Sequence, residues 1–333
     1  MKLNKVQQAA YYLIQEDSRF FYSIATISQN STKIDSNFVM MSMPYMGVFT
    51  YGANQWCNRL GLESPSFKEK EKEFYSDIRL GHKIFEKSYE EYAELIENAF
   101  IDSDNYFHNP WNVIEKVFGY YNVGVDKCND VYCGNTITSA MYCPFDCFDD
   151  ENHARQILFE YSIIAGKLTA FFGVGEFPPY RYNDRDNNVT YEDYHFFKNS
   201  PMKEKSLLGI VLFSILCSIN YVISFIDSIF IEEIPQKLKY AYLQYYYLCD
   251  FIKDLNKQKN TNFELNTTLK NREFRNCIAH YGLGQVLKEE DVLEDDVLKG
   301  LTNKTFGEDY FSMKKKIYRY LSELVYQIES YIF

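Results

Sequence analysis

The stretch Leu207–Ile226 most limits what this 333-residue chain can fold into, because no charged side chain occurs along it. A helix without a polar face must be surrounded by other helices or by lipid, and this stretch is long enough for either. Ser214, Ser218 and Tyr221 form a weakly polar stripe, and Asp227 follows directly. We therefore favour the central helix of a helical bundle, with a membrane-associated protein as the alternative.

Apolar residues recur every three to four positions in much of the remaining chain, which predicts a mainly α-helical protein. The expected helices are Lys2–Gln15, Lys68–Phe100 with a break near Gly81, Asn109–Gly119, Asp149–Phe172, Glu232–Lys259 and Tyr310–Tyr331. Other stretches lack this pattern. Phe20–Ile27 fits a short strand or a buried helix, and Pro44 and Gly47 predict an irregular Met40–Tyr51. Residues 120–150 are expected to be loop with short strands.

Glycines, prolines and an Asn/Asp run between residues 173 and 201 mark the best domain boundary. Residues 1–175 would then form a mostly helical N-terminal domain, with possible short strands, for regulation, sensing or dimerisation. Residues 176–200 are the expected linker, and residues 201–333 the expected C-terminal helical bundle. A chain of this length is more than one typical domain core requires.

The net charge of −11 argues against a protein that coats nucleic acid without specificity. The charge is unevenly distributed, however. Residues 201–333 carry 17 Lys and Arg against 18 Asp and Glu, so most of the acidic excess lies before residue 201. A local basic groove in the C-terminal part is therefore compatible with the composition.

Eight cysteines at irregular spacing, and the absence of a recognisable secretory leader, predict a reducing, cytoplasmic location. Cys128, Cys133, Cys143 and Cys147 are close enough in sequence to raise a zinc site as a hypothesis. Their spacing lacks the paired C-x-x-C knuckles of structural zinc sites, which favours ordinary thiols. We expect no metal and no cofactor.

The segment Arg272–Gly282 combines a histidine, two arginines and an asparagine within a few residues. A helix is expected to begin near Glu264 or Leu265 and to place Arg272, Asn276 and His280 on one face. Its other face carries the apolar side chains, and Gly282 can adopt the positive φ that ends a helix. The apolar face would be Phe274, Cys277, Ile278 and Tyr281.

The hexapeptide Arg275-Asn276-Cys277-Ile278-Ala279-His280 resembles the Arg, polar residue, three more, His motif of the HEPN superfamily. The resemblance covers about the last third of the chain. It implies a helical bundle, and for many members a metal-independent RNA endonuclease used as a toxin or in abortive infection and other antiviral defence. The motif residues Arg275, Asn276 and His280 would be catalytic.

The expected chemistry follows from the residue types. Among the side chains near the motif, only His280 has an ordinary pKa suited to proton transfer near neutrality, and Arg275 can fork onto phosphate oxygens. Attack by the RNA 2′-hydroxyl would leave a 2′,3′-cyclic phosphate. Lys270, Arg272 and Tyr281 are the expected substrate-binding residues, and DNA is not an expected partner.

One motif per chain leaves the second proton-transfer group unassigned. The resemblance implies that two HEPN domains pool their residues, so we expect a homodimer with a composite site, and an antitoxin or sensor protein as a further partner. The alternative is a non-catalytic HEPN module that binds nucleotide, RNA or a protein. The acidic run at 289–296 either solubilises a loop or masks the site.

Overall fold

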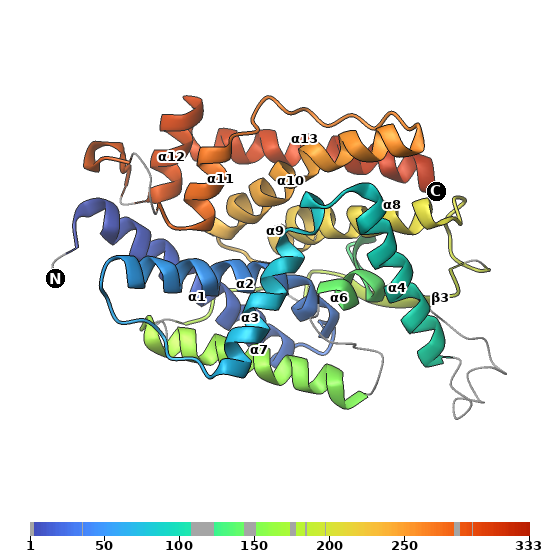
Figure 1. The fold of residues 1–333 in the computed structure, drawn as a ribbon, viewed down its shortest axis with the longest axis horizontal. Coiled ribbons are helices and arrows are strands. Elements are labelled where there is room, and N and C mark those ends of the chain that lie inside the picture. The colour runs from blue at the N-terminus through green and yellow to red at the C-terminus, as the bar shows by residue number, and fades with distance from the viewer. Residues whose placement is uncertain are drawn as a thin grey trace.

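The computed structural model describes residues 3–34, 36–107, 123–142, 151–173, 178–183, 185–196, 198–282, 287–294 and 296–333. The described chain is mainly α-helical, as predicted, with one small antiparallel sheet (Figure 1). Buried hydrophobic side chains from both the N-terminal and the C-terminal parts belong to one cluster.

The first helix, α1 (Lys5–Asn30), is much longer than predicted and includes Phe20–Ile27. Asn4 begins it, because its side chain accepts a hydrogen bond from the Gln7 amide at 2.9 Å while the Gln7 side chain binds the Asn4 amide. Phe20, Phe21 and Ile24 are buried within it. The buried-helix alternative for this stretch is therefore confirmed.

Helix α2 (Ser36–Arg59) runs through Pro44, so the predicted irregular stretch Met40–Tyr51 is wrong. Proline removes one backbone donor, but burial of Met43, Met46 and Phe49 in this helix more than offsets that loss. Gly47 allows the next helix to approach, since a Cβ there would lie 2.4 Å from the backbone nitrogen of Arg79. Tertiary packing here overrides local propensity.

The predicted break near Gly81 is confirmed, because α3 (Glu69–His82) ends there and α4 (Tyr89–Phe107) begins after the short helix η1 (Ile84–Glu86). Short strands also occur as expected. Strand β1 (Val123–Cys128) pairs antiparallel with β2 (Val131–Asn135) on one side and β3 (Val189–Tyr194) on the other. The helix expected at 109–119 lies outside the described residues.

Helix α6 (Thr136–Tyr142), which the sequence did not predict, follows β2, and α7 (Glu151–Phe171) matches its predicted range. The expected linker 176–200 contains strand β3 and a buried Tyr180, whose amide binds Ser23 of α1. Parts of this segment therefore belong to the packed structure. Helix α1 contacts α7 as well as helices of the C-terminal part.

The uncharged stretch forms α8 (Leu207–Asn220), which continues through the π-helical turn η3 (Tyr221–Ile226) into α9 (Asp227–Ile229). Among the described residues, Leu207–Ile229 is the one helix long and apolar enough to cross a membrane, and 78% of its apolar window is buried by the rest of the protein. Its neighbours include α4, α13 and the sheet. This arrangement matches the favoured central-helix interpretation.

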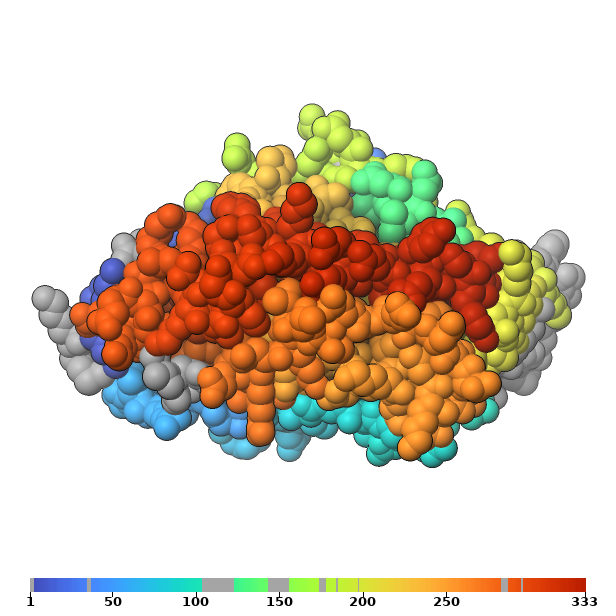
Figure 2. Space-filling model, turned by 90° about the horizontal axis from the view of Figure 1, so that it is seen from above, coloured from blue at the N-terminus to red at the C-terminus, as the bar shows by residue number. Residues whose placement is uncertain are grey.

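The C-terminal part continues with α10 (Pro235–Lys259), α11 (Arg272–Ala279), the short helix η4 (Glu289–Asp291), α12 (Val297–Phe306) and α13 (Tyr310–Ile332). Helix α12 was not predicted. Figure 2 shows α13 running across one face, beside the orange segment that precedes α11. Gln327 of α13 holds this segment by donating to the Glu264 carbonyl at 2.9 Å.

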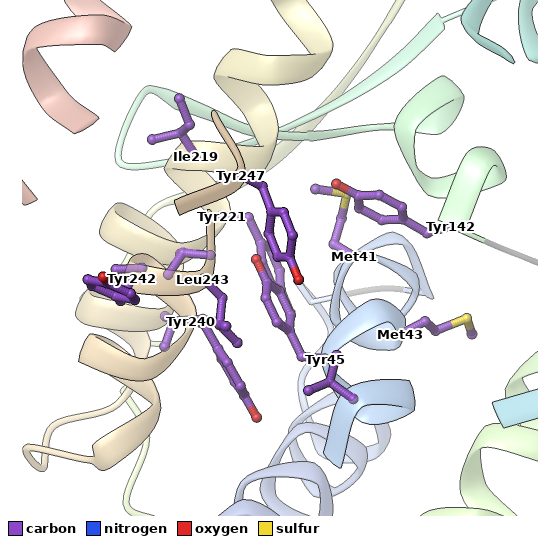
Figure 3. Packing of buried hydrophobic residues seen from close by; sticks show 14 of the residues in the cluster. Met41, Met43, Tyr45, Tyr142, Ile219, Tyr221, Tyr240, Tyr242, Leu243 and Tyr247 are labelled. Carbon is purple, nitrogen blue, oxygen red and sulfur yellow. The ribbon is translucent and has the colours of Figure 1, made fainter. Parts of the chain in front are cut away.

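Tyrosines join the N-terminal helices to α10. Tyr45 of α2 stacks on Tyr240 of α10 with ring centroids 4.3 Å apart, and Phe20 of α1 packs edge-on against the same ring at 5.3 Å. Figure 3 shows Tyr45 of α2 extending toward α10, which carries Tyr240. The packing also brings η1, which follows α3, to the motif helix α11, because Glu86 of η1 pairs with Arg275 of α11 at 3.0 Å.

Candidate functional site

Helix α11 begins at Arg272, several residues later than predicted, because Asn271 caps it by accepting from the Phe274 amide at 2.9 Å. The preceding segment stays irregular because tyrosine hydroxyls of α10 bind its carbonyls. Tyr242 donates to Leu269 and Tyr245 to Asn266, each at 2.8 Å. In a longer helix these two carbonyl groups would accept hydrogen bonds from backbone amides, but here they accept from tyrosine side chains.

His280 lies just beyond α11 as its C-cap, so the predicted face of Arg272, Asn276 and His280 is not a continuous helix face. Tyr281 and Gly282 follow with φ of 53° and 73°, and the Gly282 amide donates to the Cys277 carbonyl at 2.9 Å. The positive φ predicted for the glycine is therefore confirmed. The predicted apolar face is also confirmed, since Phe274, Cys277, Ile278 and Tyr281 are buried.

Tyr281 is a buried anchor, which contradicts its expected role in substrate binding. Its side chain is 1% exposed, and its hydroxyl donates to Asp17 of α1 and accepts from Lys239 of α10. Asp17 and Lys239 form a fully buried ion pair. This network holds the Tyr281 side chain against α1 and α10 and so supports the unusual backbone at this position.

The Arg275 guanidinium is held by two acceptors. Its Nη1 donates to Asn276 Oδ1 at 2.8 Å, and its Nη2 donates to Glu86 Oε1 at 3.0 Å. It also lies 5.2 Å and 5.1 Å from the ring centroids of Tyr246 and Tyr247. The Nε group is buried and has no hydrogen-bond partner among the described residues.

Arg275 lines a cleft of about 320 Å³ between α10, η1 and the start of α4. Aromatic side chains of Phe85, Tyr246, Tyr247 and Phe251 form much of its lining, and Glu86, Ser88, Asp250 and Asp254 add polar groups. Asp254 accepts from the first amide of α4, that of Tyr89, at 2.7 Å. The motif arginine thus faces a hollow that brings together residues from both parts of the chain.

The environment of His280 keeps its imidazole neutral at pH 7. Burial, together with the positive charges of Arg79, Arg275, Lys239 and Lys83, lowers the pKa of His280 from 6.5 to about 4. Its Nδ1 is buried and finds no partner within the described parts of the chain. These cations oppose protonation of the ring in the free protein, but they also favour an anion beside it, and a bound anion would offset their charge and raise the pKa of His280.

His82 is a second imidazole under the influence of the same cations, and the sequence analysis missed it. It ends α3 at 8% exposure, with its ring 5.0 Å from that of Tyr247 and 5.9 Å from that of Tyr45. Burial, then Arg275 and Lys83 among other cations, lower the pKa of His82 to about 3. Arg79 and His82 lie three positions apart on one face of α3, but this spacing does not show that the face approaches the motif.

The two other predicted substrate-binding residues differ in their surroundings. Lys270 forms an ion pair with Asp250 and lies 5.2 Å from the Tyr246 ring centroid, beside the cleft. Arg272 is exposed and forms no ion pair or hydrogen bond within the described residues. Lys270 therefore sits with Arg275 around the tyrosine pair, whereas Arg272 is free to meet solvent or a ligand.

Most described acids of the run 289–296 bind groups close to them in sequence, whereas Glu289 accepts from the Lys5 amide at the start of α1. Asp291 pairs with Lys304 and Glu294 with Lys299, while Asp296 caps α12 by accepting from the amides of Leu298 and Lys299. Among the described residues, no ion pair links an acid of this run to Arg275, whose partner is Glu86, although Glu289 lines a hollow beside Tyr281 and Gly282.

The zinc hypothesis concerns four cysteines, of which Cys143 and Cys147 lie outside the described residues. Cys128 and Cys133 are buried in the sheet, with their sulfur atoms 3.6 Å from Ser228 Oγ and the Asp126 carbonyl oxygen. Burial raises the pKa of both thiols. Within the described parts no group of three or more His, Cys, Asp or Glu side chains is placed to hold a metal ion.

Comparison of the chain with protein-family models, curated proteins and solved structures finds no match. The fold itself defines a mainly α-helical protein with a small antiparallel sheet.

The depressed pKa of His280 gives a pH prediction. Between pH 6.5 and 4 the unfolded chain binds a proton at this position and the folded chain does not, so folding stability should fall as the pH drops through this window. An NMR titration of the ring signal that disappears in His280→Gln should give a midpoint near 4. A midpoint near 6.5 would show that the ring is solvated and remote from the cations.

Proposed function

We propose that this chain is a metal-independent endoribonuclease of the HEPN type, acting as a toxin or antiviral defence effector. One observation carries the proposal. Arg275 lines a cleft together with Tyr246 and Tyr247, and its positive charge is one of those that lower the pKa of His280, which is not among the residues lining that cleft. This combination suits a phosphodiester better than a neutral ligand, because the cations favour added negative charge.

The proposed reaction uses the RNA's own nucleophile. The neutral His280 ring takes the proton of a 2′-hydroxyl, whose oxygen attacks the adjacent phosphorus, and the bond to the 5′-oxygen of the next nucleotide breaks. Arg275 forks onto the non-bridging oxygens as their charge rises. Asn276 orients Arg275 through the 2.8 Å hydrogen bond to Nη1. The products are a 2′,3′-cyclic phosphate and a 5′-hydroxyl.

The leaving 5′-oxygen must receive a proton, and a single imidazole cannot easily serve as both base and acid. We propose that a second copy of the chain supplies the missing group in a homodimer, as the resemblance implies. Among the described residues, His82 is a second imidazole whose pKa these cations lower. Sedimentation of a fully active protein as a strict monomer would contradict the shared site.

The proposed function is tested with two oligonucleotides of the same mixed sequence. In EDTA, the protein should cut the oligoribonucleotide and leave its 2′-O-methyl counterpart intact, because methylation removes the nucleophile. Binding of both without cleavage of either would instead favour a non-catalytic module that holds RNA in the tyrosine-lined cleft.

A further inference from the structure

We propose that Glu86 occupies the phosphate-binding edge of Arg275 as an internal stand-in for a substrate phosphate, and that RNA must displace it. The inference rests on the proposed function, because it assigns Arg275 to a phosphodiester. It adds that Glu86, from the N-terminal part of the chain, forms an ion pair with the motif arginine when no RNA is bound.

The geometry of the guanidinium supports this assignment. An arginine binds an oxyanion best along the edge where the N–H bonds of Nε and Nη2 point the same way. In this edge Nη2 donates to Glu86 at 3.0 Å, whereas Nε is buried without an acceptor among the described residues. The edge is therefore half filled, and a phosphate with two oxygens would satisfy both donors.

Glu86 is held loosely enough to be displaced. Its side chain is 39% exposed, and its second contact is with Lys83, equally exposed, at 3.2 Å. Ion pairs of partly exposed side chains stabilise a protein little, because water competes for both charges. A phosphate that gains two charge-assisted hydrogen bonds from Arg275 would replace one such bond.

Displacement also has room to occur. Arg275 and Glu86 both line the cleft of about 320 Å³, and the Arg275 side chain is 16% exposed, so an anion in the cleft can approach this side chain beside Glu86. Lys83, once separated from Glu86, adds a cation at the same place. Glu86 therefore lowers the affinity of Arg275 for anions, because an anion must first displace the Glu86 carboxylate.

The test compares Glu86→Gln with a matched control, Glu90→Gln, which removes the same charge from an exposed residue of α4 with no contact to Arg275. Fluorescence anisotropy with a short 2′-O-methyl RNA, which cannot be cut, reports binding at one low ionic strength. Glu86→Gln should bind about threefold to tenfold more tightly than the unsubstituted protein, and Glu90→Gln about equally. The gain should vanish in the double variant with Arg275→Gln.

Cleavage of the matching oligoribonucleotide separates this inference from the proposed function. Tighter binding with faster cleavage at subsaturating RNA supports both. Tighter binding that depends on Arg275, with no cleavage by any variant, supports the Glu86 contact and overturns the ribonuclease. Unchanged or weaker binding of Glu86→Gln, or an equal gain in Glu90→Gln, overturns the stand-in and leaves Glu86 as a positioning residue.

Discussion

Replacing His280 with alanine should lower RNA cleavage about 100-fold to 10,000-fold, the range that removal of a general base produces. The loss should appear in the rate at saturating RNA, because the cations that bind phosphate remain. His280 is partly exposed and its Nδ1 binds no described residue, so the fold should survive the change. Single-turnover rates on one oligoribonucleotide measure the effect.

A control variant excludes a general effect of surface charge. Arg319→Ala removes a guanidinium from α13, where the side chain is 60% exposed and lies beside Glu323. We expect its cleavage rate to equal that of the unsubstituted protein. If His280→Ala keeps its activity within error while remaining folded by circular dichroism, His280 is not the base.

Replacing Asp17 with alanine should lower the free energy of unfolding by about 3–5 kcal/mol, the loss typical of a broken buried ion pair. The change leaves the Lys239 ammonium, which is 1% exposed, without its counter-charge. It also removes the acceptor of the Tyr281 hydroxyl and of the Gln236 amide. Urea denaturation followed by circular dichroism gives the value.

Two comparisons separate the buried pair from ordinary surface pairs. Glu69→Ala breaks the exposed contact of Glu69 with Lys72 and should leave the urea midpoint unchanged. Adding Lys239→Met to Asp17→Ala should restore part of the lost stability, because it removes the uncompensated charge. If Asp17→Ala costs no more than Glu69→Ala, the network does not anchor Tyr281.

The long periodic helices α7 and α13 could be predicted from sequence because each buries one continuous stripe, whereas the first half of α10 is buried on all sides. The prediction failed where packing overrode local signals. Pro44 predicts a break, yet α2 continues because its neighbours bury it on several sides. Helix α11 starts late because tyrosines of α10 bind the backbone before it, a contact between residues more than twenty positions apart.

The candidate site was predictable only in its C-terminal half. The hexapeptide ending at His280 drew attention to Arg275 and Asn276, and the structure brings these two side chains into contact. Arg79, His82 and Glu86 lie about two hundred positions earlier, and no local pattern shows that they approach the motif. Tyr281 was assigned to substrate binding because the sequence does not show whether a tyrosine is exposed or buried. Its burial depends on Asp17 and Lys239, which are distant in sequence.

The most direct measurement is the end chemistry of total RNA incubated with purified protein in EDTA, beside Arg275→Ala and His280→Ala. We expect the unsubstituted protein to produce fragments with 5′-hydroxyl ends, which polynucleotide kinase labels without prior phosphatase treatment, and both variants to produce few or none. Intact RNA with all three proteins, or equal fragmentation by all three, would contradict a ribonuclease built on these two side chains.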